Sequence, residues 1–143
     1  MFNWLKSKPK TQIIEKPKTL GQRGEEFAQG AYKEKGYEII GANVYNKKGL
    51  RKGEIDFIAK DKQKIIFVEV KTRSALTSKF GTAEESVNMF KQLKLLKAVK
   101  LYLLQNQNYL NLQPQIDVCA VEYNEVDNSF KCAKIITNAV EDR

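Results

Sequence analysis

Two apolar, β-rich runs separated by a short polar break constrain this chain more than any other feature. Residues 53–59 read GEIDFIA, residues 65–71 read IIFVEVK, and the polar residues Asp61-Lys62-Gln63-Lys64 lie between them. β-Branched and aromatic residues favour strands, and a short polar link between two such runs predicts an antiparallel hairpin. We therefore expect the rest of the fold to be organised around this hairpin.

Three charged side chains of the predicted hairpin are candidates for a metal-dependent site. Asp56 lies among isoleucine and phenylalanine residues, where a solvated charge would be out of place. Strand alternation places Glu69 and Lys71 on one face and the intervening Val70 on the other. Two carboxylates, a lysine and the backbone carbonyl of Val70 form a set that suits an oxygen-liganded metal. The Glu-x-Lys spacing is also found as a simple charge pair on solvent-facing strands, so that alternative stays open.

The composition limits which catalytic residues and which metals the chain can use. The chain has 143 residues and no histidine, which excludes histidine-based catalysis and histidine-ligated zinc and leaves Mg²⁺ or Mn²⁺ as the expected metal. Its 42% apolar and 29% charged residues are typical of one globular domain. Cys119 and Cys132 lack CxxC spacing, and free buried thiols are favoured over a disulfide. The absence of a signal peptide or membrane-length apolar run predicts a cytoplasmic protein.

Positive charge is concentrated near the start of the chain and favours a polyanionic partner. The net charge is +8, and residues 1–19 hold five lysines and one acid, so about half of the excess lies there. We expect residues 1–18 to form a flexible basic arm and residues 19–143 to form the single folded domain. The cationic side chains expected beside the carboxylates are Lys47, Lys48, Arg51 and Lys52 of a glycine-punctuated loop, Arg73, and Lys91. A simply solvated loop is the alternative.

An acidic residue of the first predicted helix is a further site candidate. Thr19 and Gln22 form a capping-box pattern. The helical pattern runs to Lys35 and ends at Gly36, because glycine is common at the position just after the last turn of a helix. Helical spacing puts Glu25 at the edge of the buried face and Glu26 on the wetter side. Glu25 is therefore the better candidate. The competing interpretation is that both acids only stabilise the N-terminal end of the helix.

The remaining pattern completes a mixed α/β arrangement. Residues 37–45 predict a strand with an irregularity at Gly41, and residues 115–123 and 130–137 predict a closing strand pair. Between them, a second capping box predicts a helix from residue 82 to about residue 105. Its expected core stripe consists of Val87, Phe90, Leu93, Leu96 and Leu103. Asp117 is either a supporting group of the site or an acid at the start of a strand.

Several of these motifs together resemble a known family. The segments Gly24-Glu25, Gly53-Glu54-Ile55-Asp56 and Phe67-Val68-Glu69-Val70-Lys71-Thr72-Arg73 resemble the signature of the YraN-like proteins, predicted endonucleases of the PD-(D/E)xK superfamily related to archaeal Holliday-junction resolvases. The resemblance continues through residues 80–85, Lys91-Gln92 and Ile116-Asp117-Val118. It implies a restriction-endonuclease-like core, in which helices flank a mixed sheet of four to five strands.

The resemblance also implies an activity and roles for individual residues. Asp56 and Glu69 would hold Mg²⁺ or Mn²⁺, Lys71 would be the catalytic lysine, and Glu25 would match the acid contributed by the first helix. The implied reaction is hydrolysis of DNA phosphodiester bonds, with branched or structured DNA as a candidate substrate. The alternative is a nucleic-acid-binding or protein-interaction module that keeps the fold without turnover. Resolvase-like cleavage would require two active sites in one assembly, and hence a homodimer.

Overall fold

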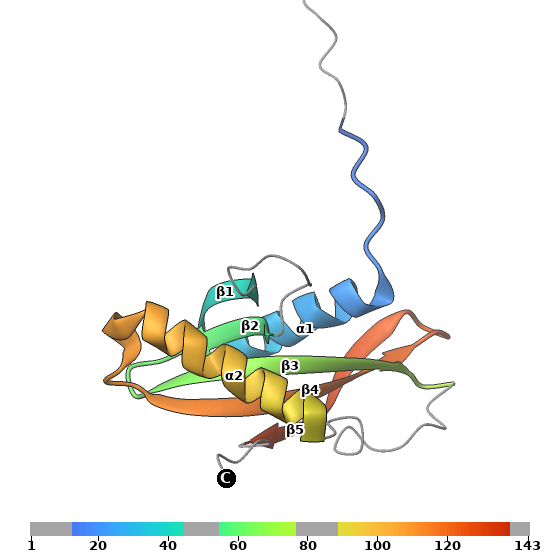
Figure 1. Cartoon of the computed structure of the whole chain (residues 1–143). Helices are drawn as coiled ribbons and strands as arrows, with labels where there is room; N and C mark the ends of the chain where they lie inside the picture. Colours follow the sequence, from blue (N-terminus) through green and yellow to red (C-terminus); the bar gives the residue numbers. More distant parts are fainter. Residues whose placement is uncertain (1–12, 45–54, 77–88, 138–143) are drawn as a thin grey trace, which may run out of the picture.

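The structure is a computed structural model that describes residues 13–44, 55–76 and 89–137, and it has an α/β fold with a five-stranded mixed sheet between two helices (Figure 1). In chain order the elements are α1 (Leu20–Glu34), β1 (Glu38–Val44), β2 (Ile55–Lys60), β3 (Lys64–Ser74), α2 (Met89–Gln105), the short 3-10 helix η1 (Gln107–Tyr109), β4 (Gln113–Asn124) and β5 (Ser129–Thr137). Strand order in the sheet follows chain order, and β3 and β4 form its parallel pair. The predicted fold class is confirmed. In these ranges no helix is long and apolar enough to cross a membrane.

The central hairpin forms as predicted. Strands β2 and β3 pair antiparallel, with Phe57 opposite Val68 at one end of the ladder and Lys60 opposite Ile65 at the other. Asp61 closes the turn, because its carboxylate accepts the N–H groups of Gln63 and Lys64 at 2.8 Å each. These two hydrogen bonds hold the pKa of Asp61 below its usual value.

Helix α1 and strand β1 also follow the predicted pattern. The capping box is present: Thr19 Oγ1 accepts the Gln22 N–H at 3.2 Å, and the Gln22 side chain accepts the Thr19 N–H at 3.0 Å. Gly36 follows the helix with a φ of +94°, a left-handed conformation that glycine adopts without steric cost. The register of β1 with β2 shifts at Ile40, beside the predicted irregularity at Gly41.

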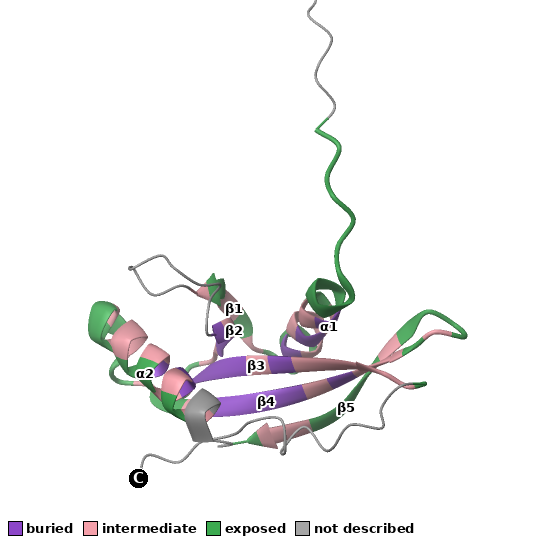
Figure 2. Cartoon of the chain, turned by 45° about the vertical axis from the view of Figure 1, so that its right-hand side comes forward, coloured by how far each residue is buried: buried purple, intermediate pink, exposed green. Residues whose placement is uncertain are grey.

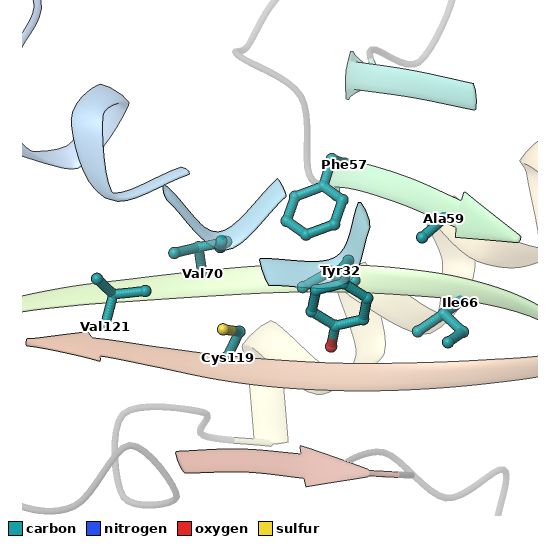
Figure 3. Close-up of a cluster of buried hydrophobic side chains, with 9 residues drawn as sticks. Tyr32, Phe57, Ala59, Ile66, Val70, Cys119 and Val121 are labelled. Atoms are coloured by element: carbon teal, nitrogen blue, oxygen red, sulfur yellow. The ribbon is translucent and has the colours of Figure 1, made fainter. Parts of the chain in front are cut away.

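Each face of the sheet carries its own apolar cluster under one helix. The α1-side cluster consists of Ala28, Tyr32, Phe57, Ala59, Ile66, Val68, Val70, Cys119 and Val121. The α2-side cluster consists of Ile55, Ile58, Ile65, Phe67, Leu95, Val99 and Ile116. Figure 2 shows the two helices on either side of the buried central strands β3 and β4, and Figure 3 shows Tyr32 among strand side chains of the α1-side cluster.

Helix α2 packs through a different stripe from the predicted one. Leu95 and Val99 are buried against the sheet and Tyr102 is packed beside them, which is a helical spacing of four and three residues. Leu93 is 61% exposed, because this stripe turns it away from the sheet. The predicted core position of Leu93 is therefore wrong, whereas Leu96 and Leu103 do pack against the cluster. The side chains of Val87 and Phe90 lie outside the described residues.

Asp117 is the buried acid of the α1 side and not a supporting group of the predicted site. It is 3% exposed, and its carboxylate accepts hydrogen bonds from the Tyr32 hydroxyl at 2.6 Å and from the Gln115 amide at 2.9 Å. It shares this face with Cys119 and Val121 by strand alternation, opposite to the face expected for Glu69. Burial and the bond to Asp117 raise the pKa of the Tyr32 phenol.

Tyr32→Phe is expected to lower the free energy of unfolding by about 1–3 kcal/mol, because it leaves the buried Asp117 carboxylate short of a donor. Urea denaturation of the purified variant measures this change. Tyr37→Phe is the matched control, since Tyr37 packs beside Tyr32 with ring centroids 5.9 Å apart and is only half-buried. Equal losses in both variants would show that the Tyr32–Asp117 bond contributes nothing specific.

The two cysteines are free, as predicted, but only one of them is buried. Cys119 of β4 lies in the α1-side cluster, whereas Cys132 is exposed on β5. The expectation that both thiols are buried is wrong for Cys132, because β5 pairs only with β4 in the described sheet and lies at its edge. Burial raises the pKa of Cys119 to about 12, with a further contribution from the neighbouring Cys132 sulfur.

Candidate functional site

The candidate site lies where the pairing of β2 with β3 ends. The β2–β3 ladder stops at the pair Phe57 and Val68, whereas the pairing of β3 with β4 continues as far as Ser74 and Tyr123. Strand β3 therefore runs on beside β4 after its ladder with β2 has ended. We use the name strand fork for this place, which comprises Asp56 of β2 and residues 69–71 of β3.

Asp56 occupies the first position beyond the ladder. Its carboxylate accepts the backbone N–H of Val70 at 2.7 Å, so a side-chain oxygen takes the place of a strand carbonyl. Strand alternation is broken here: Ile55 packs in the α2-side cluster and Phe57 in the α1-side cluster, although they are two residues apart. This change in alternation occurs at Asp56, whose carboxylate reaches across to β3.

Glu69 and Lys71 are brought together as predicted. Val68 and Val70 belong to the α1-side cluster, so alternation directs Glu69 and Lys71 to the other face. Lys71 Nζ lies 3.2 Å from Glu69 Oε1, and the two side chains are 21% and 24% exposed. The ion pair is half-buried, which screens it less than a pair at the open surface. Lys71 is thus held next to the Glu69 carboxylate.

Burial and neighbouring carboxylates raise the pKa of Asp56 at the strand fork. The pKa of Asp56 is raised to about 8, first by burial and then by the negative charge of Glu69. The Val70 N–H acts in the opposite direction, and the charge of Glu25 adds a smaller increase. The charge of Glu25 on α1 thus acts on Asp56, and the role of Glu25 in the site stays a prediction. Around Asp56, negative charge therefore outweighs positive charge.

The donor set suits a small divalent cation. Mg²⁺ is commonly held by one or two carboxylates and keeps several of its water ligands. Asp56 and Glu69 provide two carboxylates whose mutual repulsion a cation would relieve. Among the described residues no three acidic or cysteine side chains gather closely enough to hold an ion. Metal ligation by Asp56, Glu69, Glu25 and the Val70 carbonyl stays a prediction.

Gly24 positions the second turn of α1 beside the strand fork, a role that the sequence motif did not reveal. It is buried, and a Cβ atom at this position would lie 1.9 Å from Thr72 Oγ1. Thr72 follows Lys71 directly, so α1 approaches β3 next to the fork only because residue 24 has no side chain. Glu25 is carried to the fork by this close approach. Glu26, by contrast, is exposed and pairs with Lys18.

The structure describes only some of the cationic residues that are predicted to contact phosphate. Lys47, Lys48, Arg51 and Lys52 lie outside the described residues, as does the side chain of Lys91 in α2. Arg73 is half-buried on β3, opposite Glu122 of β4 in the strand register. Strand alternation places Arg73 on the same face as Glu69 and Lys71. Contact of these residues with nucleic acid stays a prediction.

The fold and the site define an α/β protein with an Asp and a Glu-x-Lys pair at a strand fork, and comparison with known proteins gives the family. Residues 24–121 match the uncharacterised protein family UPF0102. A UPF0102 protein of Carboxydothermus hydrogenoformans is 40% identical over 111 residues, 78% of this chain and 86% of that protein. One of Caldicellulosiruptor saccharolyticus is 42% identical over 120 residues, 84% of this chain and 95% of that protein. The chain belongs to UPF0102, the family of YraN-like proteins.

Proposed function

We propose that this protein is a Mg²⁺- or Mn²⁺-dependent endonuclease that hydrolyses DNA phosphodiester bonds. One observation carries the proposal: the carboxylates of Asp56 and Glu69 share the strand fork, and a lysine is ion-paired to one of them. Phosphodiester hydrolysis requires neutralised phosphoryl oxygens and an activated water, and an acid pair with a lysine suits both needs. Family membership supports the fold on which this set is built.

Each residue of the strand fork has a distinct part in the proposed reaction. A divalent cation bound by Asp56 and Glu69 would polarise the phosphoryl group and lower the pKa of a coordinated water. The Val70 N–H fixes the orientation of the Asp56 carboxylate, and Lys71 fixes that of Glu69. The Lys71 ammonium group would also stabilise negative charge as it develops on the phosphate. Glu25 adds negative charge that favours cation binding.

The proposed partner is DNA, with branched or structured DNA as the candidate substrate. The net charge of +8 and the lysine-rich first residues favour a polyanion whose affinity falls as salt rises. Cleavage of a junction would need two strand forks in one assembly, so the proposal includes a homodimer for that substrate. It also includes a cytoplasmic location.

Cleavage of linear duplex and four-way-junction DNA by the purified protein tests the proposal. Wild type should cleave at least one substrate with Mg²⁺ or Mn²⁺ and none with EDTA. Lys71→Met should reduce the rate by about 100-fold or more, because it removes the cation that stabilises the developing charge. Lys60→Met is the matched control, since Lys60 of β2 also forms an ion pair, with Glu38 of β1 at an Nζ–Oε2 distance of 3.5 Å, and lies at the opposite end of β2 from Asp56. Its rate should stay within about twofold of wild type.

Two outcomes would contradict this proposal. Cleavage that survives both Lys71→Met and Glu69→Gln would mean that the strand fork is not the active site. Salt-sensitive DNA binding without cleavage of any substrate, together with no calorimetric signal for Mn²⁺, would instead identify a binding module on the same fold.

A further inference from the structure

The two cysteines are brought together by an irregularity in the β4–β5 pairing. Cys119 Sγ and Cys132 Sγ lie 3.7 Å apart. In the strand register Ala120 faces Lys134 and Val121 faces Cys132, which leaves Ala133 as an extra residue on β5. Such a bulge changes which side chains share a face.

The bulge determines where the Cys132 side chain points. Ile135 faces Cys119 in the register and packs against the α1-side cluster. Cys132 is three residues before Ile135, so a regular strand would place it on the opposite face. Because Ala133 is inserted, Cys132 instead faces the same side as Val121 and Cys119. The backbone register therefore directs Cys132 toward Cys119, so the sulfur contact does not depend on the side-chain conformation alone.

The two thiols also differ in access to solvent. Cys119 is fully buried, and the labelled view in Figure 3 shows its sulfur inside the α1-side cluster. Cys132 is exposed at the edge of the sheet. A disulfide S–S bond is about 2.05 Å long, so the two sulfurs must approach by roughly 1.6 Å, and side-chain rotation is the movement expected to close this gap. An exposed thiol beside a buried one is the arrangement of a reacting and a resolving cysteine.

We propose that Cys119 and Cys132 are a redox-reactive pair that forms a reversible intramolecular disulfide in response to a peroxide. The Cys132 thiolate attacks a peroxide oxygen, the O–O bond breaks, and a sulfenic acid forms while the other oxygen leaves as water after protonation. The Cys119 sulfur then attacks the Cys132 sulfur; the S–S bond forms as the S–O bond breaks, and water leaves with the thiol proton. Two thiols and hydrogen peroxide thus give one disulfide and two water molecules.

This inference does not depend on the proposed nuclease function. It rests on the sulfur contact, the bulge and the difference in exposure, none of which involves the strand fork. The pair nevertheless lies close to the fork, because Cys119 is the register partner of Val70 in β3. The redox state of the pair should therefore be held constant when the fork is assayed.

Peroxide titration of the full-length wild-type protein tests the pair. Both free thiols should disappear together, the intact mass should fall by two hydrogen atoms, and dithiothreitol should reverse the change. Trypsin cuts after Lys131, so the disulfide should link the peptide of residues 101–131 to the peptide of residues 132–134. The oxidised protein should stay monomeric on non-reducing gels and gain roughly 5 °C in Tm.

Single variants separate the two steps. In Cys119→Ala, Cys132 has no resolving partner, so dimedone should trap its sulfenic acid. In Cys132→Ser, the buried Cys119 should stay reduced at the same peroxide concentration. The proposal is overturned if wild type accumulates trapped sulfenic acid without forming the linked peptides, or if the disulfide joins two protein molecules. Because the linked peptides are sought in wild type, the test stands even if a variant fails to fold.

Discussion

Asp56→Asn is expected to stabilise the folded protein at pH 8 and to remove its stabilisation by Mg²⁺. The pKa of Asp56 is raised from the ordinary 3.8 to about 8, because burial and the nearby Glu69 charge disfavour the ionised form. Asparagine carries no charge at any pH, and its side-chain oxygen can still accept the Val70 N–H. The variant therefore keeps the hydrogen bond without the repulsion.

The sign of the pH dependence follows from this raised pKa. The folded state accommodates the protonated form of Asp56. The contribution of Asp56 to the free energy of unfolding is therefore fully present below about pH 4. That contribution is lost as the pH rises to about 8, since the unfolded chain ionises first. Water still reaches the half-buried site, so we expect the loss to be on the order of 2 kcal/mol, less than the full linkage value. Asp56→Asn should lack this fall.

Urea denaturation at pH 5 and pH 8, with and without MgCl₂, measures both effects. Wild type should gain stability from Mg²⁺ at pH 8, whereas Asp56→Asn should gain none. Asp61→Asn is the control, because the pKa of Asp61 is shifted in the opposite direction: the Gln63 and Lys64 N–H groups hold it below its usual value. It should not stabilise the protein at pH 8. An Asp56→Asn variant less stable than wild type at pH 8 would show that the charged carboxylate is fully compensated.

Gly24→Ala is expected to destabilise the fold by about 2–3 kcal/mol, the cost of forcing a methyl group into a closely packed contact. The new Cβ would lie 1.9 Å from Thr72 Oγ1 and 2.9 Å from Thr72 Cβ and Cγ2, so α1 must shift away from β3. Thermal and urea unfolding measure the loss. Any metal response of the strand fork should weaken as well, because Glu25 moves with α1.

Gly30→Ala is the matched control within the same helix. A Cβ at Gly30 meets nothing within 4 Å, so alanine should stabilise the protein by about 0.5–1 kcal/mol through helix propensity alone. Thr72→Ala in the Gly24→Ala background should recover part of the loss, since it removes the two outer atoms of the clash. Equal effects of alanine at positions 24 and 30 would contradict the close-contact explanation.

The elements were predictable wherever local patterns determine structure. The hairpin of β2 and β3 follows from two β-rich runs and the turn at Asp61, and α1 follows from its capping box and Gly36. The pairing of Glu69 with Lys71 follows from alternation along one strand. The same alternation would not have revealed that Asp56 reaches Val70, because the strand is irregular at that residue.

Features that depend on contacts distant in sequence were not predictable. Leu93 and Leu95 are equally apolar, and only the position of α2 on the sheet decides that Leu95 is buried. The need for glycine at position 24 comes from Thr72 on β3, 48 residues later by the numbering. Asp117 is bonded to Tyr32, 85 residues earlier, on the face opposite to the one expected for the site. The periodicity of apolar residues along the sequence does not indicate which of these distant residues come into contact.

The bulges in β1 and β5 have a consequence for self-association. Strands β1 and β5 are the outer strands of the described sheet, and the pairing of each with its neighbour has one register shift, at Ile40 in β1 and at Ala133 in β5. A bulge bends a strand and interrupts the regular spacing of its outward-facing N–H and C=O groups. Lys131 and Lys134 add exposed positive charge along β5. These features disfavour edge-to-edge joining of two copies into a continuous sheet, so the proposed homodimer would use helices or loops instead.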